Sequence, residues 1–348
     1  MKILCLGDIA INDVSLIGCR WSLPGNIVPG NDEKIIFNWE VPLGEKVITK
    51  PRDSGPRLFV DIRTPHILEK WAPGYATLAT NHMLDAGTKG LSDTIHELQV
   101  IGFKTIGAGL TEDDISEPIV WKTDQGCLSI VNWVFPETNP DWMSVPGVNC
   151  WQGLDKAEKM ISRLKEKSDW VMTILHWSDE LFYYPRPEDR DIAQRLVQMG
   201  SDMIIGHHPH VVRGYEFIKG CPIFYSLGNF FFSDFRINNG GWIRQAPLNK
   251  LGLGVVFSFQ KGSLPSFEII SYLQTKQGVI VDKLRRAEKR LDKLNLPLER
   301  FANKEYSIWY HKERSKFMKL TAKWEFGIRK LGIKGVSKYF LNKIKILR

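Results

Sequence analysis

The sequence has few cysteines, and no two of them are closely spaced. Five cysteines are scattered over 348 residues, at positions 5, 19, 127, 150 and 221. An odd, dispersed set without a CxxC motif argues against a disulfide framework and against a thiolate metal site. We therefore expect most of these cysteines to behave as small, buried apolar side chains.

Long apolar runs are missing as well. No stretch of about 18 apolar residues occurs, so the sequence predicts no transmembrane helix. The N-terminal residues MKILCLGDIA contain one lysine and a short apolar stretch before a polar turn. A signal peptide needs a longer apolar region and a small-residue cleavage site. This segment is typical of a first core strand, and we expect a cytoplasmic protein.

An excess of basic charge is absent from most of the chain. The net charge is +8, but residues 310–348 alone contain twelve Lys and Arg and two Glu, a net charge of +10. The remaining residues therefore carry −2, and the basic pI comes from the tail. Because the main part of the chain has no basic excess, we expect no nucleic-acid partner.

Short apolar runs recur along the first two thirds of the chain. Their length, β-branched residues and flanking Gly, Pro, Asn or Asp predict strands at 2–7, 34–39, 75–80, 103–108, 127–135, 170–175, 202–206 and 222–228. Amphipathic patterns between them predict helices at 90–102, 154–167 and 187–200. This alternation predicts an α/β fold with much parallel sheet.

Two closely spaced runs, residues 252–260 and 266–273, are typical of antiparallel strands. The composition then changes to charged helix at about residue 281 and to a basic tail at the end. We therefore expect one domain over residues 1–280 and a charged helical extension over residues 281–348.

Side chains that bind metals or exchange protons follow the ends of the predicted strands. They are Asp8, Asn38, Glu40, Asn81, His82, His176, Glu180, His208, His210 and Asn229. In open α/β sheets, ligands bind outside the carboxyl ends of the strands. The sequence therefore predicts that these side chains meet in one site.

The segment "GHHPH" provides three of the eight histidines in the chain. In an extended segment, His208 and His210 would point to the same side, and Pro209 between them limits other conformations. On this interpretation His207 points the other way and is a weaker candidate ligand than His208 and His210. Imidazole, carboxylate and amide donors without sulfur suit Mn²⁺, Fe or Zn²⁺.

Simpler interpretations exist for each residue alone. A single His-x-His is more often loop polarity than a metal site, and Asp8 and Asn81 are common in caps and turns. The same chemistry at five separate strand ends nevertheless favours a metal site for the whole set.

Six motifs resemble the bacterial capsule synthesis protein CapA family, which is associated with poly-γ-glutamate capsules and is a branch of the calcineurin-like metallophosphoesterases. They are "GDIAI", "NWEVPL", "LATNHMLDAG", "TIGAGL", "LHWSDEL" and "IGHHPHVV…YSLGNFFF", in the family's order over about residues 1–235. The resemblance implies a four-layer α/β/β/α metallophosphoesterase-like sandwich with a dinuclear metal site at the strand ends.

Carried over residue by residue, the resemblance implies two divalent transition-metal ions (Mn, Fe or Zn). Its expected ligands are Asp8, Glu40, Asn81, His176, His208 and His210, with Glu40 bridging the ions. His82 is expected to contact the substrate or to protonate the leaving group. Asn38, Glu180 and Asn229 are expected to line the site. The sequence departs from the family's pattern at Thr80 and Ser178, where the family usually has Asn and Gly.

The expected function is metal-dependent hydrolysis of a phosphoester or a γ-glutamyl-type amide in capsule or surface-polymer biosynthesis. The substrate would be an anionic small molecule or polymer. The alternative is a non-catalytic, metal-containing accessory subunit of a surface-polymer assembly complex. The residues alone do not separate phosphoester from amide.

The basic tail at residues 310–348 allows two interpretations. Its apolar residues from Phe317 to Leu347 recur at intervals of three or four, which predicts a helix with one apolar face. Such a helix either packs on the domain or lies on the anionic inner face of the membrane, giving a peripheral location. Both interpretations stay open at the level of sequence.

Overall fold

The protein was analysed as a computed structural model, which describes residues 1–18, 21, 27–45, 56–138, 145–236 and 242–321. The chain divides into two compact units, residues 1–300 and residues 301–348. Residues 281–300, which the sequence assigned to the helical extension, lie within the first unit and contain two short helices from residue 286 onward.

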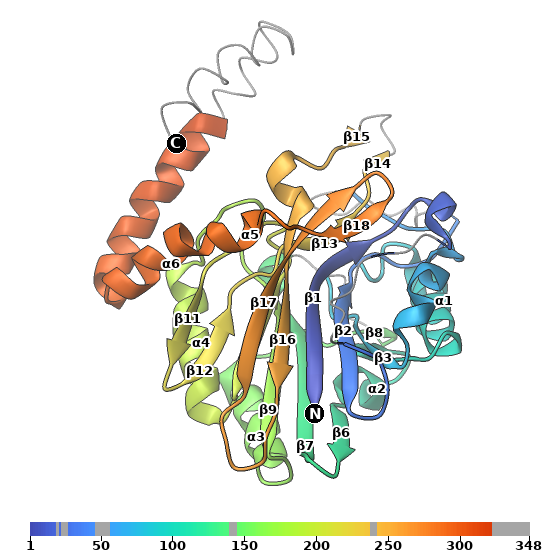
Figure 1. Cartoon of the computed structure of the whole chain (residues 1–348), viewed down its shortest axis with the longest axis horizontal. Helices are drawn as coiled ribbons and strands as arrows, with labels where there is room; N and C mark the ends of the chain where they lie inside the picture. The colour runs from blue at the N-terminus through green and yellow to red at the C-terminus, as the bar shows by residue number, and fades with distance from the viewer. Residues whose placement is uncertain (19–20, 22–26, 46–55, 139–144, 237–241, 322–348) are drawn as a thin grey trace, which may run out of the picture. The chain divides into compact units, whose positions relative to one another are not determined.

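Two large β-sheets dominate the first unit (Figure 1). The eight-stranded sheet contains, in spatial order, β18 (Gly278–Val281), β17 (Ser266–Thr275), β16 (Leu251–Ser258), β1 (Lys2–Ala10), β2 (Glu33–Trp39), β3 (Gly74–Thr77) and β4 (Phe103–Ile106), with β13 (Asn229–Phe232) also paired to β1. The six-stranded sheet contains β11 (Tyr215–Ile218), β12 (Cys221–Phe224), β10 (Met203–His207), β9 (Trp170–His176), β7 (Gly126–Val134) and β6 (Ile119–Thr123).

The direction of the strands agrees with the sequence pattern. Strands β1 to β4 run parallel, as do β7, β9, β10 and β12. Strands β16 and β17 pair antiparallel, which confirms the expectation for the two closely spaced runs after residue 250. The carboxyl ends of the parallel strands in each sheet therefore lie along one edge of that sheet.

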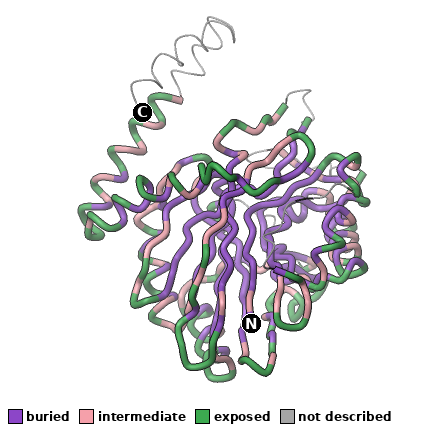
Figure 2. Tube along the Cα trace, viewed as in Figure 1, coloured by how far each residue is buried: buried purple, intermediate pink, exposed green. Residues whose placement is uncertain are grey.

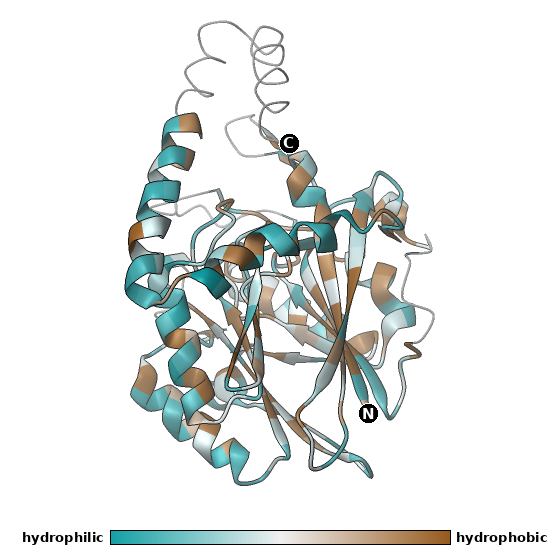
Figure 3. Ribbon diagram, turned by 60° about the vertical axis from the view of Figure 1, so that its left-hand side comes forward, coloured by the Kyte–Doolittle hydropathy of each residue, from teal (hydrophilic) through white to brown (hydrophobic). Residues whose placement is uncertain are grey.

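Alternating residues of β1 enter two different apolar layers. Ile3 and Cys5 join a core that also contains side chains of β7, β9 and β10, so this core fills the space between the two sheets. Leu4 and Leu6 point to the opposite face and join a second core with Leu91 of α1 (Gly87–Val100). Figures 2 and 3 show the resulting buried, apolar strands in both sheets.

Helices cover the outer faces of the two sheets. Helix α1 packs on the first sheet, while α3 (Leu154–Lys165) contacts both β9 and α4 (Pro187–Met199). The remaining helices of the first unit are α2 (Glu112–Ser116), α5 (Arg286–Lys289) and α6 (Leu291–Arg300). Two sheets packed face to face with helices outside confirm the predicted four-layer α/β/β/α sandwich.

The ends of α4 follow the sequence signals that predicted this helix. Pro187 occupies the first turn, where its missing N–H is not needed for an intrahelical bond. Gly200 ends the helix with a φ of 116°, a left-handed conformation that suits glycine. Residues 303–321 of the second unit are also helical, and most of the basic tail, residues 322–348, lies outside the described residues. No described helix is both long and apolar enough to cross a membrane.

Candidate metal centre

Strand register places three of the predicted residues side by side in the first sheet. Asp8 of β1 is the register partner of Asn38 on β2 and of Asn229 on β13. In the second sheet, the last residues of β9 and β10, His176 and His207, are register partners of each other. Each sheet thus contributes polar side chains at the end of its parallel strands.

A glycine allows β13 to approach β1 closely beside Asp8. A Cβ atom on Gly7 would lie 1.9 Å from the carbonyl oxygen of Gly228, so only glycine fits at this position. The Asp8 backbone N–H donates a hydrogen bond of 3.0 Å to the same oxygen. In the "GD" motif, the glycine is therefore required for close packing of β13 on β1, and the aspartate contributes its carboxylate to the candidate site.

The predicted ligands gather into three overlapping groups, each compact enough to hold a metal ion. In each group the donor atoms lie within 4.8 Å of one another: Asp8 with Glu40 and His210; Glu40 with His176 and His208; and Glu180 with His208 and His210. Glu40 is shared by the first two groups. Glu40 is therefore the carboxylate that could contribute to more than one of these groups.

Both oxygens of the Glu40 carboxylate are buried and accept no well-aligned hydrogen bond from the described residues; His210 Nε2 faces Oε1 at 3.3 Å. Burial raises the pKa of Glu40, and the positive charge of nearby His210 opposes this effect. A fully buried carboxylate is strongly destabilising unless cations compensate it. Glu40 therefore fits a position next to a bound metal ion.

His176 and His208 are suited to be neutral nitrogen ligands. Both are buried, and their ring centroids are 4.8 Å apart. Burial and the neighbouring histidines hold the pKa of both rings well below the usual range. Nδ1 of His208 has no hydrogen-bond partner among the described residues. Neutral imidazole is the form that coordinates a metal.

His210 has a different electrostatic environment because it faces carboxylates. Its Nε2 lies 3.3 Å from Glu40 Oε1, and its Nδ1 lies 2.9 Å from Asn229 Oδ1. Burial lowers the pKa of His210, but the charges of Glu40 and Asp8 outweigh burial and raise the pKa to about 10. Asn229 therefore orients the ring, with Nε2 directed towards Glu40.

The structure corrects the backbone predicted for the "HHPH" segment. His208 and His210 have φ values of 93° and 57°, so both are left-handed rather than extended. The two rings still face one site, with centroids 5.9 Å apart. The prediction that His207 points away is wrong, because its Nδ1 lies 2.9 Å from Asp8 Oδ1, although without hydrogen-bond alignment. Because these residues form a turn, their side chains do not alternate between two sides as they would in an extended strand.

Asn81 and His82 lie in the loop after β3. Asn81 Oδ1 is 3.0 Å from His176 Nε2, which places this amide oxygen among the ligands. Nδ1 of His82 is 2.6 Å from Asp85 Oδ2. Asp85 is buried and also accepts hydrogen bonds from the Leu58 N–H and from Arg57. Asp85 was not predicted as a site residue, because the sequence distinguishes it only by its position three residues after His82.

Asn38 supports the ligands rather than joining them. Its Nδ2 donates to Asp8 Oδ1 over 3.0 Å and lies 3.4 Å from His176 Nδ1. Its Oδ1 accepts a hydrogen bond from the Thr77 hydroxyl. Asn38 thus fixes a carboxylate on one sheet beside an imidazole on the other.

A buried arginine holds the turn that carries Glu180. The Arg213 guanidinium donates to Ser178 Oγ, to the Asp179 carbonyl and to the Phe182 carbonyl. Arg213 is 1% exposed, and its charge is compensated by buried Asp189 at 3.8 Å. This structural role of Arg213 was not predicted, because a single arginine after a strand end matches no sequence motif.

Ser178 occupies a turn position that favours glycine, and hydrogen bonds of its side chain stabilise it there. It adopts a φ of 74°, which is unusual for a side-chain-bearing residue. Its hydroxyl donates to Asp189 over 2.5 Å and accepts from Arg213. The hydrogen bonds compensate the backbone strain at the position where the resembling family usually has glycine.

The described donors fit one or two transition-metal ions. Carboxylate oxygens, imidazole nitrogens and one amide oxygen converge, and no sulfur takes part. At the sequence level, a family model described as "Bacterial capsule synthesis protein PGA_cap" matches residues 30–234. The chain belongs to this family. The resemblance that the motifs predicted is therefore confirmed.

Two relatives with related names match more than half of the chain. The PGA biosynthesis protein CapA of Bacillus subtilis (strain 168) is 29% identical over 211 residues, covering 60% of this chain and 53% of that protein. The capsule biosynthesis protein CapA of Bacillus anthracis is 29% identical over 229 residues, covering 62% and 52% respectively. The chain thus spans about half the length of these relatives. A crystal structure of a hypothetical protein from Thermus thermophilus aligns with a TM-score of 0.45 and 13% identity, covering 81% of this chain and all of that one.

Proposed function

We propose that this protein is a metal-dependent hydrolase that cleaves a phosphoester or a γ-glutamyl-type amide in the biosynthesis of a capsule or another surface polymer. The observation that carries the proposal is Glu40, whose fully buried carboxylate is shared by two potential metal-binding groups. Two divalent ions, Mn, Fe or Zn, would supply Lewis acidity and a bound water of lowered pKa.

Each of the two ligand groups that share Glu40 draws on both layers of the sandwich. Asp8 lies in β1 and Glu40 directly after β2 of the first sheet, whereas His176 ends β9 and His208 and His210 follow β10 of the second. All five side chains are buried, so the packing around them would hold the donors in place before a substrate arrives.

His82 is positioned for proton transfer to the leaving group. Donation of Nδ1–H to Asp85 would fix the tautomer of the neutral ring and give Nε2 the acceptor role that proton exchange with a substrate atom needs. Asp85 is fixed in turn by the Leu58 N–H, so the orientation of the ring is determined by the protein. General acid catalysis requires this kind of positioned group.

A non-catalytic accessory role is the alternative. A structural metal site needs a complete ligand set, but it does not need an oriented histidine beside that set. The His82–Asp85 pair therefore favours hydrolysis.

The test is a substrate screen with manganese-loaded protein. Phosphomonoesters, phosphodiesters and γ-glutamyl peptides are assayed in parallel, with the H82N variant as control. Turnover that H82N loses while it retains metal supports the hydrolase. Metal retention without turnover on any of the three classes supports the accessory role.

A further inference from the structure

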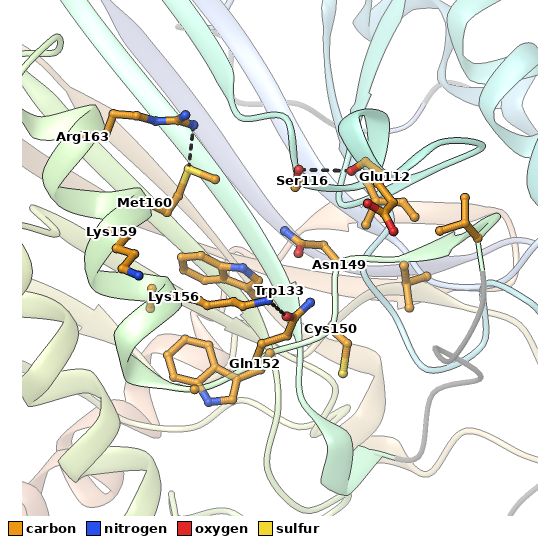
Figure 4. A pocket seen from close by; sticks show the side chains of 16 residues that line it. Glu112, Ser116, Trp133, Asn149, Cys150, Gln152, Lys156, Lys159, Met160 and Arg163 are labelled. Atoms are coloured by element: carbon orange, nitrogen blue, oxygen red, sulfur yellow. Dashed lines mark hydrogen bonds between the residues drawn. The ribbon is translucent and has the colours of Figure 1, made fainter.

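A pocket lies beside the metal centre but contains none of its predicted ligands. It is formed by the end of β7, the segment around β8 (Gly147–Val148), α2 and α3 (Figure 4). Its volume of about 980 Å³ is at the upper end of small-molecule sites, large enough for a short oligomer. Trp133 of its lining comes directly before Val134, which is the register partner of the predicted ligand His176.

Three basic side chains of α3 give the pocket an excess of positive charge. Lys156, Lys159 and Arg163 are spaced three and four residues apart, on one face of the helix, and all line the pocket (Figure 4). Lys156 bonds the neutral Gln152, and Arg163 contacts the sulfur of Met160. None of the three forms an ion pair with a described carboxylate, and Glu112 is the only acidic residue in the described lining.

Further N–H donors face the same space. Helix α3 begins after Gly153, which lines the pocket and has no side chain to cap the first-turn N–H groups; Asp155, the acidic residue of that turn, does not line the pocket. Trp133 also lines the pocket and is buried, with 7% of the residue exposed, and its indole N–H is a further donor in this lining. A helix N-terminus with such donors favours an anion or another acceptor-rich ligand.

Aromatic rings complete the wall. The rings of Trp133 and half-buried Trp151 meet edge to face, with centroids 5.5 Å apart. Phe135 stacks on Trp151 at 4.7 Å and lies 5.8 Å from Trp177, the residue after His176. A continuous row of rings therefore connects the pocket to the metal centre. Tryptophan offers both an apolar surface and an N–H donor, a combination that suits the C–H face and the oxygens of a sugar ring.

We propose that this pocket is a binding subsite for an acidic saccharide, a short run of sugar rings that carry carboxylates. The cations and N–H groups would bind the carboxylates, and the tryptophans would contact the rings. The assignment goes beyond the proposed function, because it names a class of polymer that the pocket binds and leaves open which bond is cleaved. Binding itself needs neither metal nor turnover.

The test measures binding by titration calorimetry with the full chain at about 0.15 M salt, which screens exposed charges. The probe is an oligogalacturonate of four residues, and maltotetraose is the neutral comparison. We expect the oligogalacturonate to bind and maltotetraose to bind at least about tenfold more weakly. The triple variant K156A/K159A/R163A should weaken oligogalacturonate binding at least about tenfold, and W133F several-fold.

Two controls make the outcome specific. The variant K276A/K283A/K289A removes the same charge from exposed positions outside the pocket, and its affinity should equal that of the native protein. The variant H208A/H210A should lose metal yet still bind the saccharide, which separates this proposal from the proposed function. Absence of binding, equal weakening by both triple variants, or tighter binding of a γ-linked glutamate tetramer would overturn the saccharide assignment.

Discussion

His82 Nδ1 and Asp85 Oδ2 are 2.6 Å apart in the loop after β3, and both side chains are buried. This pair, three residues apart in the chain, fixes the tautomer and the direction of the His82 ring. The first prediction follows from that geometry. H82N should retain its metal content but lose about 10²–10⁴-fold in turnover, because a positioned general acid contributes that much.

The D85N variant tests the orientation of His82 separately. It removes the charged acceptor for Nδ1–H, so we expect lower kcat and an altered pH profile with unchanged metal content. If Asp85 has only a structural role, D85N should instead lower the thermal stability and leave the pH profile of the remaining activity unchanged. Steady-state kinetics over a pH series, together with elemental analysis, distinguishes these results.

Metal content is the second prediction. Protein expressed with Mn²⁺ or Fe²⁺ should contain close to two equivalents of metal, measured by mass spectrometry of the elements. H208A/H210A should abolish binding, because at least one of these two rings takes part in each of the three ligand groups. H207A should weaken binding less, since His207 contacts Asp8 but belongs to none of the three groups of described residues. Complete metal loss in H207A alone would contradict this assignment.

The third prediction concerns the buried ion network behind the Glu180 turn. Asp189 is fully buried and accepts hydrogen bonds from Ser178 and Arg186, while it compensates Arg213. D189A should lower the free energy of unfolding by about 3–5 kcal/mol, because it leaves buried charge without a partner. Denaturant titration measures the change.

An exposed ion pair provides the matched control for D189A. Lys89 and Asp93 pair along α1, with the Lys89 side chain 84% exposed. D93A should therefore lower the free energy of unfolding by less than about 1 kcal/mol. Equal effects of D189A and D93A would show that the network around Arg213 is not a structural requirement.

Thiol reactivity is the fourth prediction. Burial raises the pKa of Cys150 to about 12, and burial also raises the pKa of Cys5 and Cys221. The thiolate, which is the reactive form, is therefore scarce at pH 8 in the native protein. We expect iodoacetamide to label these three positions only after unfolding. Half-exposed Cys127 should react earlier and acts as an internal reference in peptide mapping.

The fifth prediction concerns the basic tail. We propose that residues 310–348 bind anionic membrane surfaces, since basic residues near such a surface contribute about 1 kcal/mol each. Full-length protein should sediment with anionic vesicles at low salt and much less at high salt or with neutral vesicles. A chain that ends at Trp309 should stay in solution. Identical sedimentation of both chains would favour a packing role for the tail.

Much of the fold could be predicted because buried parallel strands produce short apolar runs. The eight predicted strands correspond to β1, β2, β3, β4, β7, β9, β10 and β12 in the structure. Strand β13 was not predicted, because its residues 229–232 directly follow a buried turn and show no separate apolar pattern in the sequence. Its position beside β1 depends on the close approach at Gly7, which only tertiary structure shows.

The site was predictable where strand ends carried unusual side chains, as at Asp8 and His176. It was not predictable where function depends on partners from elsewhere in the chain. Arg213, Asp189 and Ser178 look ordinary in the sequence, yet together they hold the Glu180 turn. The backbone of His208 and His210 was also missed, because the left-handed conformation is imposed by the turn rather than by Pro209.

Hydrolysis by the metal-loaded protein tests the central claim most directly. Manganese-loaded protein and its H82N variant, matched for metal content, are assayed side by side on phosphomonoesters, phosphodiesters and γ-glutamyl peptides. We predict turnover of at least one class by the native protein and a loss of about 10²–10⁴-fold in H82N. Two bound metal ions with no turnover on any class, or equal rates for both proteins, would contradict the assignment of a hydrolase that uses His82.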